Sequence, residues 1–245
     1  MANINNNKEI YNSFILKIDS IVKDYLSVSG NSYCPIDEKI INDPIWGSIK
    51  LYGYEIKIID TPLYQRLRDI YQVGLGVFTY PSARHSRFEH SLGTTAIASR
   101  MIENLKQKSP IVNDNDVTEV RLAALLHDIG HCFYSDLSES FYGILPEFLE
   151  LNRYINFEYD GIKPKPHELF SYLIINTPTF IKFLEANQII PSQLSDKCNG
   201  VKGVMKRIGN MIIGFKNKPR DDQDKGMTYS FLTKIINGDI DADKL

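Results

Sequence analysis

This 245-residue chain has few cysteines, no long apolar run and no secretory signal pattern. It has three cysteines, Cys34, Cys132 and Cys198, and their spacing fits neither a disulfide framework nor a zinc ribbon. No apolar run approaches the roughly 18 residues that a membrane-spanning helix needs. The first residues lack the basic and apolar regions of a secretory signal. These absences favour a reducing compartment and predict a cytoplasmic protein.

The chain also lacks an excess of charge of either sign. It contains 28 Lys and Arg residues and 30 Asp and Glu residues, which leaves a net charge of −2. A surface that binds nucleic acid is normally basic, so this balance argues against a nucleic-acid partner. A small anionic substrate needs only a few local cations. Hydrophobic residues make up 43% of the chain, an ordinary globular composition that can bury a sizeable core.

Hydrophobic spacing divides the chain into two parts. Residues 8–27 carry apolar side chains at helical spacing and predict an amphipathic helix, while Ser, Gly and Pro in 27–35 predict a linker. We therefore interpret 1–35 as an N-terminal helix with its linker and 36–245 as the main domain. Residues 48–60 alternate and are rich in Ile and Tyr, which predicts one short β-hairpin near the start of that domain.

The rest of the main domain is predicted to be helical, so the fold class is mainly α. Asp60 is the candidate N-cap of a helix that has Pro62 in its first turn and runs to Gly74. Further expected helices span 90–107, 116–130, 136–152, 166–175, 178–187, 192–209 and 228–238. The polar, charge-rich stretch 215–226 predicts an exposed loop.

Chemistry is concentrated in the segment AALLHDIGH. An apolar approach leads to His127, Asp128 and His131. On a continuous helix the two histidines share a face, one turn apart, and Asp128 is offset by roughly 100°. Imidazole and carboxylate groups bind divalent transition metals, or Mg²⁺ where oxygens dominate. A charge at the end of an apolar helix is costly unless something binds it, so the segment predicts a metal site with further ligands elsewhere. An ordinary surface His–Asp pair is the alternative.

Four segments in a fixed order extend this interpretation. They are KIINDPIWGSIKLYGYEIKIID (39–60), TPLYQRLRDIYQVG (61–74), PSARHSRFEHSLG (81–93) and LAALLHDIGH (122–131). The set resembles HD-domain deoxynucleoside triphosphate triphosphohydrolases, over about residues 38–176 and again over 228–245. The resemblance implies a helical HD-domain fold and a metal-dependent phosphohydrolase. In the family the products are a deoxynucleoside and inorganic triphosphate.

The resemblance also implies roles for individual residues. The implied ligands of a divalent metal ion (Mn, Fe, Mg, Zn, Ni or Co) are His90, His127, Asp128 and Asp243. The implied catalytic histidines are His131 and His167. The implied substrate contacts are Arg87, Gln72 and Lys244. Such a metal activates water and neutralises charge on the α-phosphate, and the leaving oxygen then needs a proton donor.

Asp136 departs from the family pattern, because it stands where the family has a histidine near the leaving oxygen. A carboxyl group donates a proton only if burial or a neighbouring negative charge raises its pKa. Otherwise His131 or His167 takes the role. Two alternatives therefore stay open: hydrolysis of another nucleotide (a monophosphate, a cyclic nucleotide or an alarmone), or a weakly catalytic nucleotide-binding sensor.

Two further expectations follow from the resemblance. An activating guanine-nucleotide site at a subunit interface of a homo-oligomer is implied by Lys39, Asn42, Asp60, Gln65 and Arg68. The alternative is that Asp60 caps its helix, while Gln65 and Arg68 are solvated or form interface salt bridges. The match stops at Leu245, where family members continue, so we expect a domain truncated at its C-terminal side.

Overall fold

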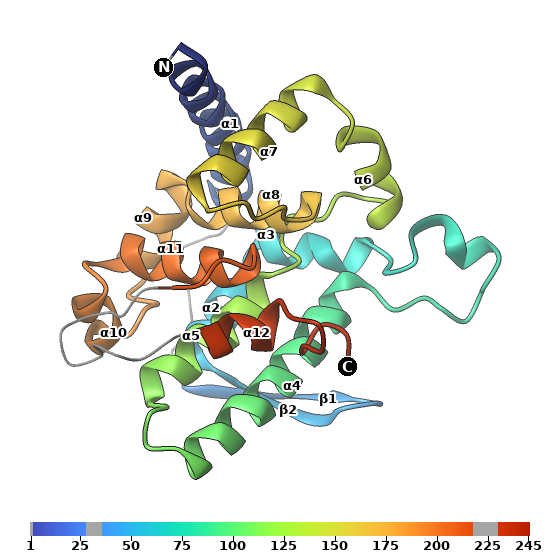
Figure 1. Ribbon diagram of the computed structural model, residues 1–245. Helices are drawn as coiled ribbons and strands as arrows, with labels where there is room; N and C mark the ends of the chain where they lie inside the picture. Colours follow the sequence, from blue (N-terminus) through green and yellow to red (C-terminus); the bar gives the residue numbers. More distant parts are fainter. Residues whose placement is uncertain (1, 28–35, 218–229) are drawn as a thin grey trace.

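The computed structural model describes residues 2–27, 36–217 and 230–245 and has the mainly helical fold that the sequence predicts (Figure 1). Its elements are α1 (Ala2–Ser27), β1 (Glu38–Asp43), β2 (Gly47–Tyr52), α2 (Gly53–Ile59), α3 (Pro62–Gln65), the 3₁₀ helices η1 (Arg66–Asp69) and η2 (Gly74–Phe78), α4 (Arg87–Lys108), α5 (Asp114–Leu126), α6 (Asp136–Tyr142), α7 (Pro146–Glu158), α8 (Pro166–Ile175), α9 (Pro178–Ala186), α10 (Ser192–Lys197), α11 (Val201–Ile212) and α12 (Ser230–Ile236). Within the described ranges, no helix combines the length and apolarity that crossing a bilayer requires.

The β-hairpin is present, but it lies earlier than predicted. Strands β1 and β2 pair antiparallel with Ile41 opposite Ile49, and Asp43 Oδ1 accepts hydrogen bonds from two backbone amides of the turn. Residues 53–59, predicted to be part of the hairpin, form α2 instead. The helix begins there because Glu55 Oε2 accepts a hydrogen bond from the amide of Tyr52, which closes a capping box. Tertiary contacts thus override the strand propensity of the Ile-rich segment.

Helix α5 is the centre of the core. Val120, Leu122 and Leu125 are fully buried, and α5 packs against α4, α11 and α12. Two buried ion pairs tie α5 to its neighbours: Arg121 to Glu55 of α2 at 2.7 Å, and Glu119 to Arg207 of α11 at 2.7 Å. Charges buried in this way need both their partners and their hydrogen bonds, so these pairs fix how the helices meet.

The N-terminal helix packs onto the main domain. The predicted helix over 8–27 is confirmed, and it begins already at Ala2. Ile18 and Val22 are buried in the common core, where α1 contacts α7, α8 and α9. Asp19 Oδ1 accepts a hydrogen bond of 2.7 Å from the amide of Thr179, at the start of α9. The expected linker at 28–35, with Cys34, and most of the expected loop at 215–226 lie outside the described residues.

Several helix boundaries differ from those predicted. The expected helix over 136–152 is broken after Tyr142 and resumes at Pro146, and the expected helix over 192–209 is broken near Gly200, whose φ is +90°. The helix after Asp60 ends at Asp69 in a 3₁₀ turn, not at Gly74. Its N-cap is Thr61, whose Oγ1 accepts from the amide of Tyr64, while Asp60 is the C-cap of α2. The structure corrects the predicted N-cap.

Candidate metal centre and active site

The HDIGH segment is a turn and not the end of a helix. Helix α5 stops at Leu126, with His127 as its C-cap, so the predicted helix through Gly130 is wrong, as is a shared helical face for His127 and His131. The Arg66 guanidinium holds the turn by donating to the carbonyl of His131 at 2.7 Å and to that of Ile129. The amide of Gly130 donates to Ser171 Oγ of α8, so the turn is fixed on both sides.

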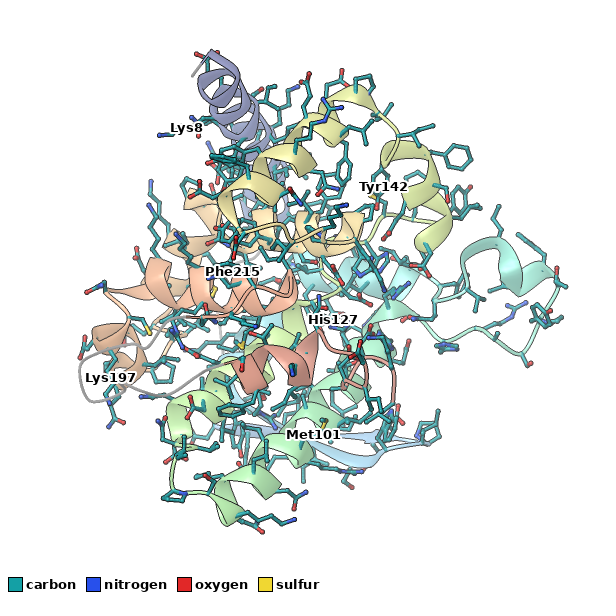
Figure 2. The ribbon with its side chains drawn as sticks, viewed as in Figure 1. Lys8, Met101, His127, Tyr142, Lys197 and Phe215 are labelled. Atoms are coloured by element: carbon teal, nitrogen blue, oxygen red, sulfur yellow. The ribbon has the colours of Figure 1, made fainter. Side chains whose placement is uncertain are left out.

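The four predicted metal ligands converge although they come from distant segments. His90 lies on α4 and Asp243 on the segment after α12, and His90 Nε2 is 2.7 Å from Asp243 Oδ1. His127 Nε2 lies 3.3 Å from the same oxygen and 3.2 Å from Asp128 Oδ1. His90 Nε2 lies 3.6 Å from Asp128 Oδ2. Figure 2 labels His127 near the middle of the view, close to the C-terminal segment that carries Asp243.

These residues fit a divalent metal ion. His127 Nδ1 donates to the carbonyl of Ala124 at 2.7 Å, so in the neutral ring, the form that binds a metal ion, Nε2 carries the lone pair. Within the described part of the chain, His127 Nε2 and Asp128 Oδ1 are buried and have no hydrogen-bond partner. A buried polar atom without a partner is costly, and a cation bound between the two would satisfy both. A ligating histidine held through its other ring nitrogen is also the usual arrangement at metal sites.

The electrostatics favour a cation at the same place. Burial opposes protonation of His127, but the Asp128 and Asp243 carboxylates outweigh it and raise its pKa to about 9. Burial likewise opposes ionisation of Asp128 and Asp243. Nearby histidines nevertheless hold the pKa of both carboxyl groups below their ordinary value, and for Asp128 the guanidinium of Arg87 adds to the effect. The Asp128 and Asp243 carboxylates thus favour a positive charge at His127, which a divalent ion bound among them would supply in place of the proton.

Arg87 connects this centre to the predicted catalytic residues. Its buried guanidinium donates to Asp128 Oδ2 at 2.8 Å and to Asp136 Oδ1 at 3.0 Å. Ser135 Oγ accepts two further bonds from it, the Nε bond at 2.9 Å. A carboxyl group that donates a proton must be buried or lie beside a negative charge. Asp136 is not buried, since its side chain is 72% exposed, and its nearest charged partner is the positive guanidinium of Arg87.

His131 and His167 form a second group beside the first. Their rings stack with centroids 4.1 Å apart, and their Nε2 atoms lie 3.3 and 3.9 Å from Asp128 Oδ1. On the other side of the rings, Glu139 Oε1 lies 2.6 Å from His167 Nδ1 and 3.5 Å from His131 Nδ1. Burial lowers the pKa of His131. Both histidines thus point one nitrogen at the metal centre and the other at a carboxylate.

A cavity of about 600 Å³ opens next to His90 and Asp243. That volume lies in the range of small-molecule sites. The hairpin turn with Trp46 forms one wall, and Gln72, whose buried Oε1 has no hydrogen-bond partner among the described residues, is another lining residue. Lys244 also lines the cavity, but its ammonium group bonds to Asp241 at 2.5 Å and to the carbonyl of Gly238 at 2.6 Å.

The expected effector residues fall into two groups. Lys39 and Asn42 lie on the exposed strand β1, while Asp60, Gln65 and Arg68 lie around α3 and η1. Gln65 accepts a hydrogen bond of 2.7 Å from Arg68 and donates to the carbonyl of Ile59. Arg68 also lies 3.6 Å above the ring of Phe88.

Two further residues, Arg66 and Ser135, support the site, although no expectation for them followed from the sequence. Arg66 orders the turn that carries Asp128, and Ser135 links the guanidinium of Arg87 to the carbonyl of Gln72, to which it donates at 3.0 Å. Both contacts span more than forty residues of sequence, so no local pattern indicates them.

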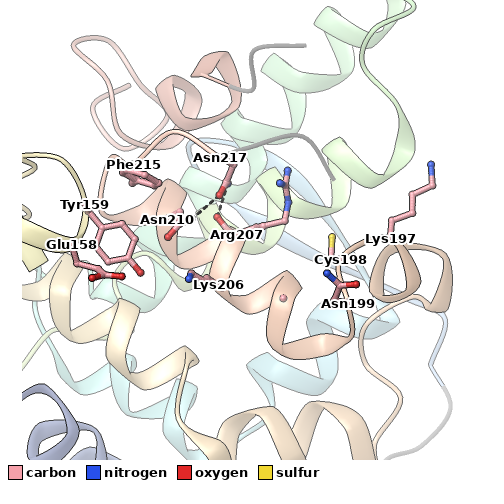
Figure 3. A pocket seen from close by; sticks show the side chains of 11 residues that line it. Glu158, Tyr159, Lys197, Cys198, Asn199, Lys206, Arg207, Asn210, Phe215 and Asn217 are labelled. Carbon is pink, nitrogen blue, oxygen red and sulfur yellow. Dashed lines mark hydrogen bonds between the residues drawn. The ribbon is translucent and has the colours of Figure 1, made fainter. Parts of the chain in front are cut away.

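A second cavity, of about 360 Å³, lies away from these residues (Figure 3). Its walls come from the end of α7, the α10–α11 turn, α11 and the segment after it. Asn217 bridges Asn210 and the carbonyl of Arg207 by hydrogen bonds of 2.9 and 2.8 Å. None of the predicted site residues lines this cavity.

Residues 87–173 match the HD domain family, a span that contains His90, His127, Asp128 and His167. The chain therefore carries an HD domain over these residues. It is 32% identical over 216 residues to the deoxynucleoside triphosphate triphosphohydrolase SAMHD1 of Homo sapiens, across 84% of this chain and 32% of that protein. It is 36% identical over 217 residues to SAMHD1 of Gallus gallus, with the same coverage of 84% and 32%.

A solved structure is similar over the same extent. The crystal structure of a hypothetical protein from Aquifex aeolicus matches with a TM-score of 0.57 and 28% identity, across 84% of this chain and 44% of that one. The chain thus spans about a third of the length of the human and chicken relatives.

Proposed function

We propose that this protein is a metal-dependent phosphohydrolase that acts on nucleotides, and that its substrates are deoxynucleoside triphosphates. The observation that carries the proposal is the convergence of His90, His127, Asp128 and Asp243, with unpartnered buried ligand atoms, beside a cavity of about 600 Å³. The similarity to two deoxynucleoside triphosphate triphosphohydrolases supports the substrate class. A divalent ion held there lowers the pKa of water and offsets charge at the α-phosphate.

Arg87 and Gln72 hold the substrate in this proposal. The planar guanidinium of Arg87 is held beside the candidate metal ligands by Asp128, Ser135 and Asp136, and we expect it to contact a phosphate oxygen there. A preorganised cation stabilises charge that develops on a phosphoryl group without reorganising during the reaction. The buried Oε1 of Gln72 accepts a hydrogen bond from a sugar hydroxyl. Lys244, tied to Asp241, shapes the cavity wall.

His131 or His167 supplies the proton that the reaction needs. Attack of water on the α-phosphorus breaks its bond to the 5′-oxygen, and the departing alkoxide takes a proton. His167 is the better placed donor, because Glu139 Oε1 accepts from its Nδ1 and fixes the orientation of the ring. Asp136, which is exposed and paired with Arg87, acts as an orienting group for that guanidinium.

The regulatory part of the proposal concerns a homo-oligomer activated by a guanine nucleotide. It is supported by the exposed position of Lys39 and Asn42 on β1, and by the resemblance of those segments to regulated members of the family. Analytical ultracentrifugation with and without GTP tests it. We expect GTP to shift the chain to a larger species and Lys39→Ala to abolish the shift.

Product analysis tests the central proposal. The chain is incubated with dNTPs, NTPs, nucleoside monophosphates and cyclic nucleotides in Mn²⁺, Mg²⁺ or Fe²⁺, and products are separated by ion-exchange chromatography. We expect deoxynucleoside and intact triphosphate from dNTPs. Release of orthophosphate from monophosphates, or of a linear product from cyclic nucleotides, identifies the alternative substrate class, and binding without turnover identifies a sensor.

A further inference from the structure

Ser135 lies between the two residues that hold the substrate in the proposed function. Its side chain is buried, and its Oγ accepts hydrogen bonds from Arg87 Nε at 2.9 Å and from Arg87 Nη2 at 2.5 Å. The same hydroxyl donates to the main-chain carbonyl of Gln72 at 3.0 Å. A hydroxyl has one hydrogen and two lone pairs, so these bonds use all that the side chain offers. Ser135 is thus fully engaged between the two residues.

The backbone at Ser135 has a conformation that residues other than glycine rarely adopt. Tyr134 has a φ of +92°, and Ser135 has a φ of +53° with a ψ of −133°. Such conformations are costly for residues with a side chain and persist only where the surroundings impose them. Glycine would adopt them without that cost. The serine at 135 therefore indicates a use for its hydroxyl that offsets the strain.

Three segments of the chain meet at this hydroxyl. The segments that carry Gln72 and Arg87 form an antiparallel bridge, in which the amide of Gln72 donates to the carbonyl of His85 at 3.0 Å. The third segment approaches closely, because a Cβ atom added to Gly74 would lie 2.5 Å from the carbonyl oxygen of Tyr134. A shift of the backbone at Gln72 would therefore displace the hydroxyl of the third segment and, with it, the guanidinium of Arg87.

The guanidinium of Arg87 has few donors left for a ligand. Of its five N–H groups, four donate within the described part of the chain: one to Asp128, one to Asp136 and two to Ser135. The fifth, on Nη1, is left for a phosphate oxygen. Its direction depends on the other four bonds, and Ser135 accepts half of them. Without the serine hydroxyl, only the two aspartates would orient the guanidinium.

We propose that Ser135 is a positioning residue that couples the sugar contact of Gln72 to the phosphate contact of Arg87. A sugar hydroxyl bonded to Gln72 fixes the segment to which Ser135 donates, and the serine in turn holds the Arg87 guanidinium in the direction that the reaction requires. Recognition of the sugar then raises the rate of turnover and not only the affinity. The inference rests on the proposed function, which supplies the roles of Gln72 and Arg87.

Steady-state kinetics in Mn²⁺ with dATP and with 2′,3′-dideoxy-ATP, which lacks the 3′-hydroxyl, test the coupling. We expect the wild-type protein to prefer dATP. Ser135→Ala should lower kcat on dATP by about 10- to 100-fold, because it removes two hydrogen bonds from a charged group, and change KM by less than about threefold. It should also lower the preference for dATP by about fivefold or more, although Gln72 is unchanged. A loss of folded protein alone would lower kcat but not this preference.

Ser135→Gly separates the role of the hydroxyl from backbone strain. Glycine removes the hydroxyl and relieves the positive φ, so this variant should melt at a higher temperature than Ser135→Ala. It should nevertheless lose kcat and the preference for dATP to the same extent. Ser140→Ala, which changes an exposed serine of α6, is the matched control and should keep both wild-type values.

The outcomes distinguish this inference from the proposed function. Wild-type kcat or wild-type preference in the two Ser135 variants overturns the inference and leaves the proposed function standing. Absence of turnover by the wild-type protein contradicts the proposed function, and the coupling is then measured from calorimetric Kd values for the two nucleotides. Equal Kd ratios in wild type and Ser135→Ala overturn the inference in that case, and failure of the wild type to bind either nucleotide overturns both.

Discussion

At the scale of single residues, Asp128 has the most contacts in the site. Its carboxylate lies within 4 Å of Arg87 and of four histidines: His90, His127, His131 and His167. No other carboxylate in the described site faces as many of the predicted residues. A substitution at Asp128 should therefore change both the affinity for a cation and the stability of the folded protein.

Asp128→Asn is predicted to weaken metal binding by about 100-fold or more, because the amide removes the negative charge at the centre of the ligand set. It also leaves the buried Arg87 with only the exposed carboxylate of Asp136, so the free energy of unfolding should fall by about 3 kcal/mol. Calorimetric Mn²⁺ titration and urea unfolding measure the two effects. Asp239→Asn, an exposed carboxylate nearby, should change neither, and full Mn²⁺ occupancy in Asp128→Asn would refute the ligand assignment.

Arg66 contributes through the backbone. Its guanidinium donates to two carbonyls of the HDIGH turn, and burial lowers its pKa. Arg66→Met leaves these carbonyls without donors, so we expect a loss of about 2 kcal/mol in the free energy of unfolding. The neighbouring Arg68→Met removes an exposed guanidinium and should cost less than about 1 kcal/mol. Urea denaturation of both variants measures the two losses in the free energy of unfolding. Equal losses would contradict the role of Arg66 in holding the turn.

At the scale of elements, the site depends on how closely α8 approaches the turn. A Cβ atom added to Gly130 would lie 2.3 Å from the carbonyl oxygen of His167 and 2.4 Å from the amide nitrogen of Ser171. Both are backbone atoms, which cannot move aside alone. A side chain at position 130 must therefore push α8 away and separate His167 from His131.

Gly130→Ala is accordingly predicted to destabilise the protein by about 2–3 kcal/mol. It should also weaken Mn²⁺ binding, because the turn carries Asp128. Gly76→Ala is the matched control, since its Cβ would meet Val73 only at 3.4 Å or more. Thermal unfolding and Mn²⁺ titration of both variants test this. Wild-type stability in Gly130→Ala would show that the turn and α8 are not held together by this contact.

The elements also show how far the sequence could be interpreted. The helices at 166–175 and 178–187 were predictable because a proline opens each and their apolar faces are periodic. The segment 53–59 was wrongly predicted to belong to the hairpin, because its isoleucines favour a strand. The helix that it forms is accompanied by a contact of Glu55 with Arg121, which is distant in sequence. The His127–Asp128 pair was predictable from one segment. The turn after Leu126 was not, because the residues that hold it, Arg66 and Ser171, are distant in sequence.

At the scale of the whole molecule, the metal centre joins parts of the chain that are far apart in sequence. His90 and Asp243 are separated by 153 positions, and their contact holds the segment after α12 against α4. Because the ligands are brought together only by folding, a bound ion stabilises the folded chain and not the unfolded one. Metal binding and global stability should therefore change together.

Addition of Mn²⁺ to metal-free protein is predicted to raise the melting temperature. At a free ion concentration about 100 times the Kd, binding contributes about 2.7 kcal/mol, which corresponds to about 5–10 °C for a chain of this size. Differential scanning calorimetry measures the shift, and EDTA should reverse it. Asp128→Asn is the control, and its melting temperature should rise by no more than about 1–2 °C at the same Mn²⁺ concentration, because its Kd is about 100-fold higher or more. If the melting temperature of Asp128→Asn rose as much as that of the wild type, the stabilising Mn²⁺ ion would bind elsewhere on the protein and not at this centre.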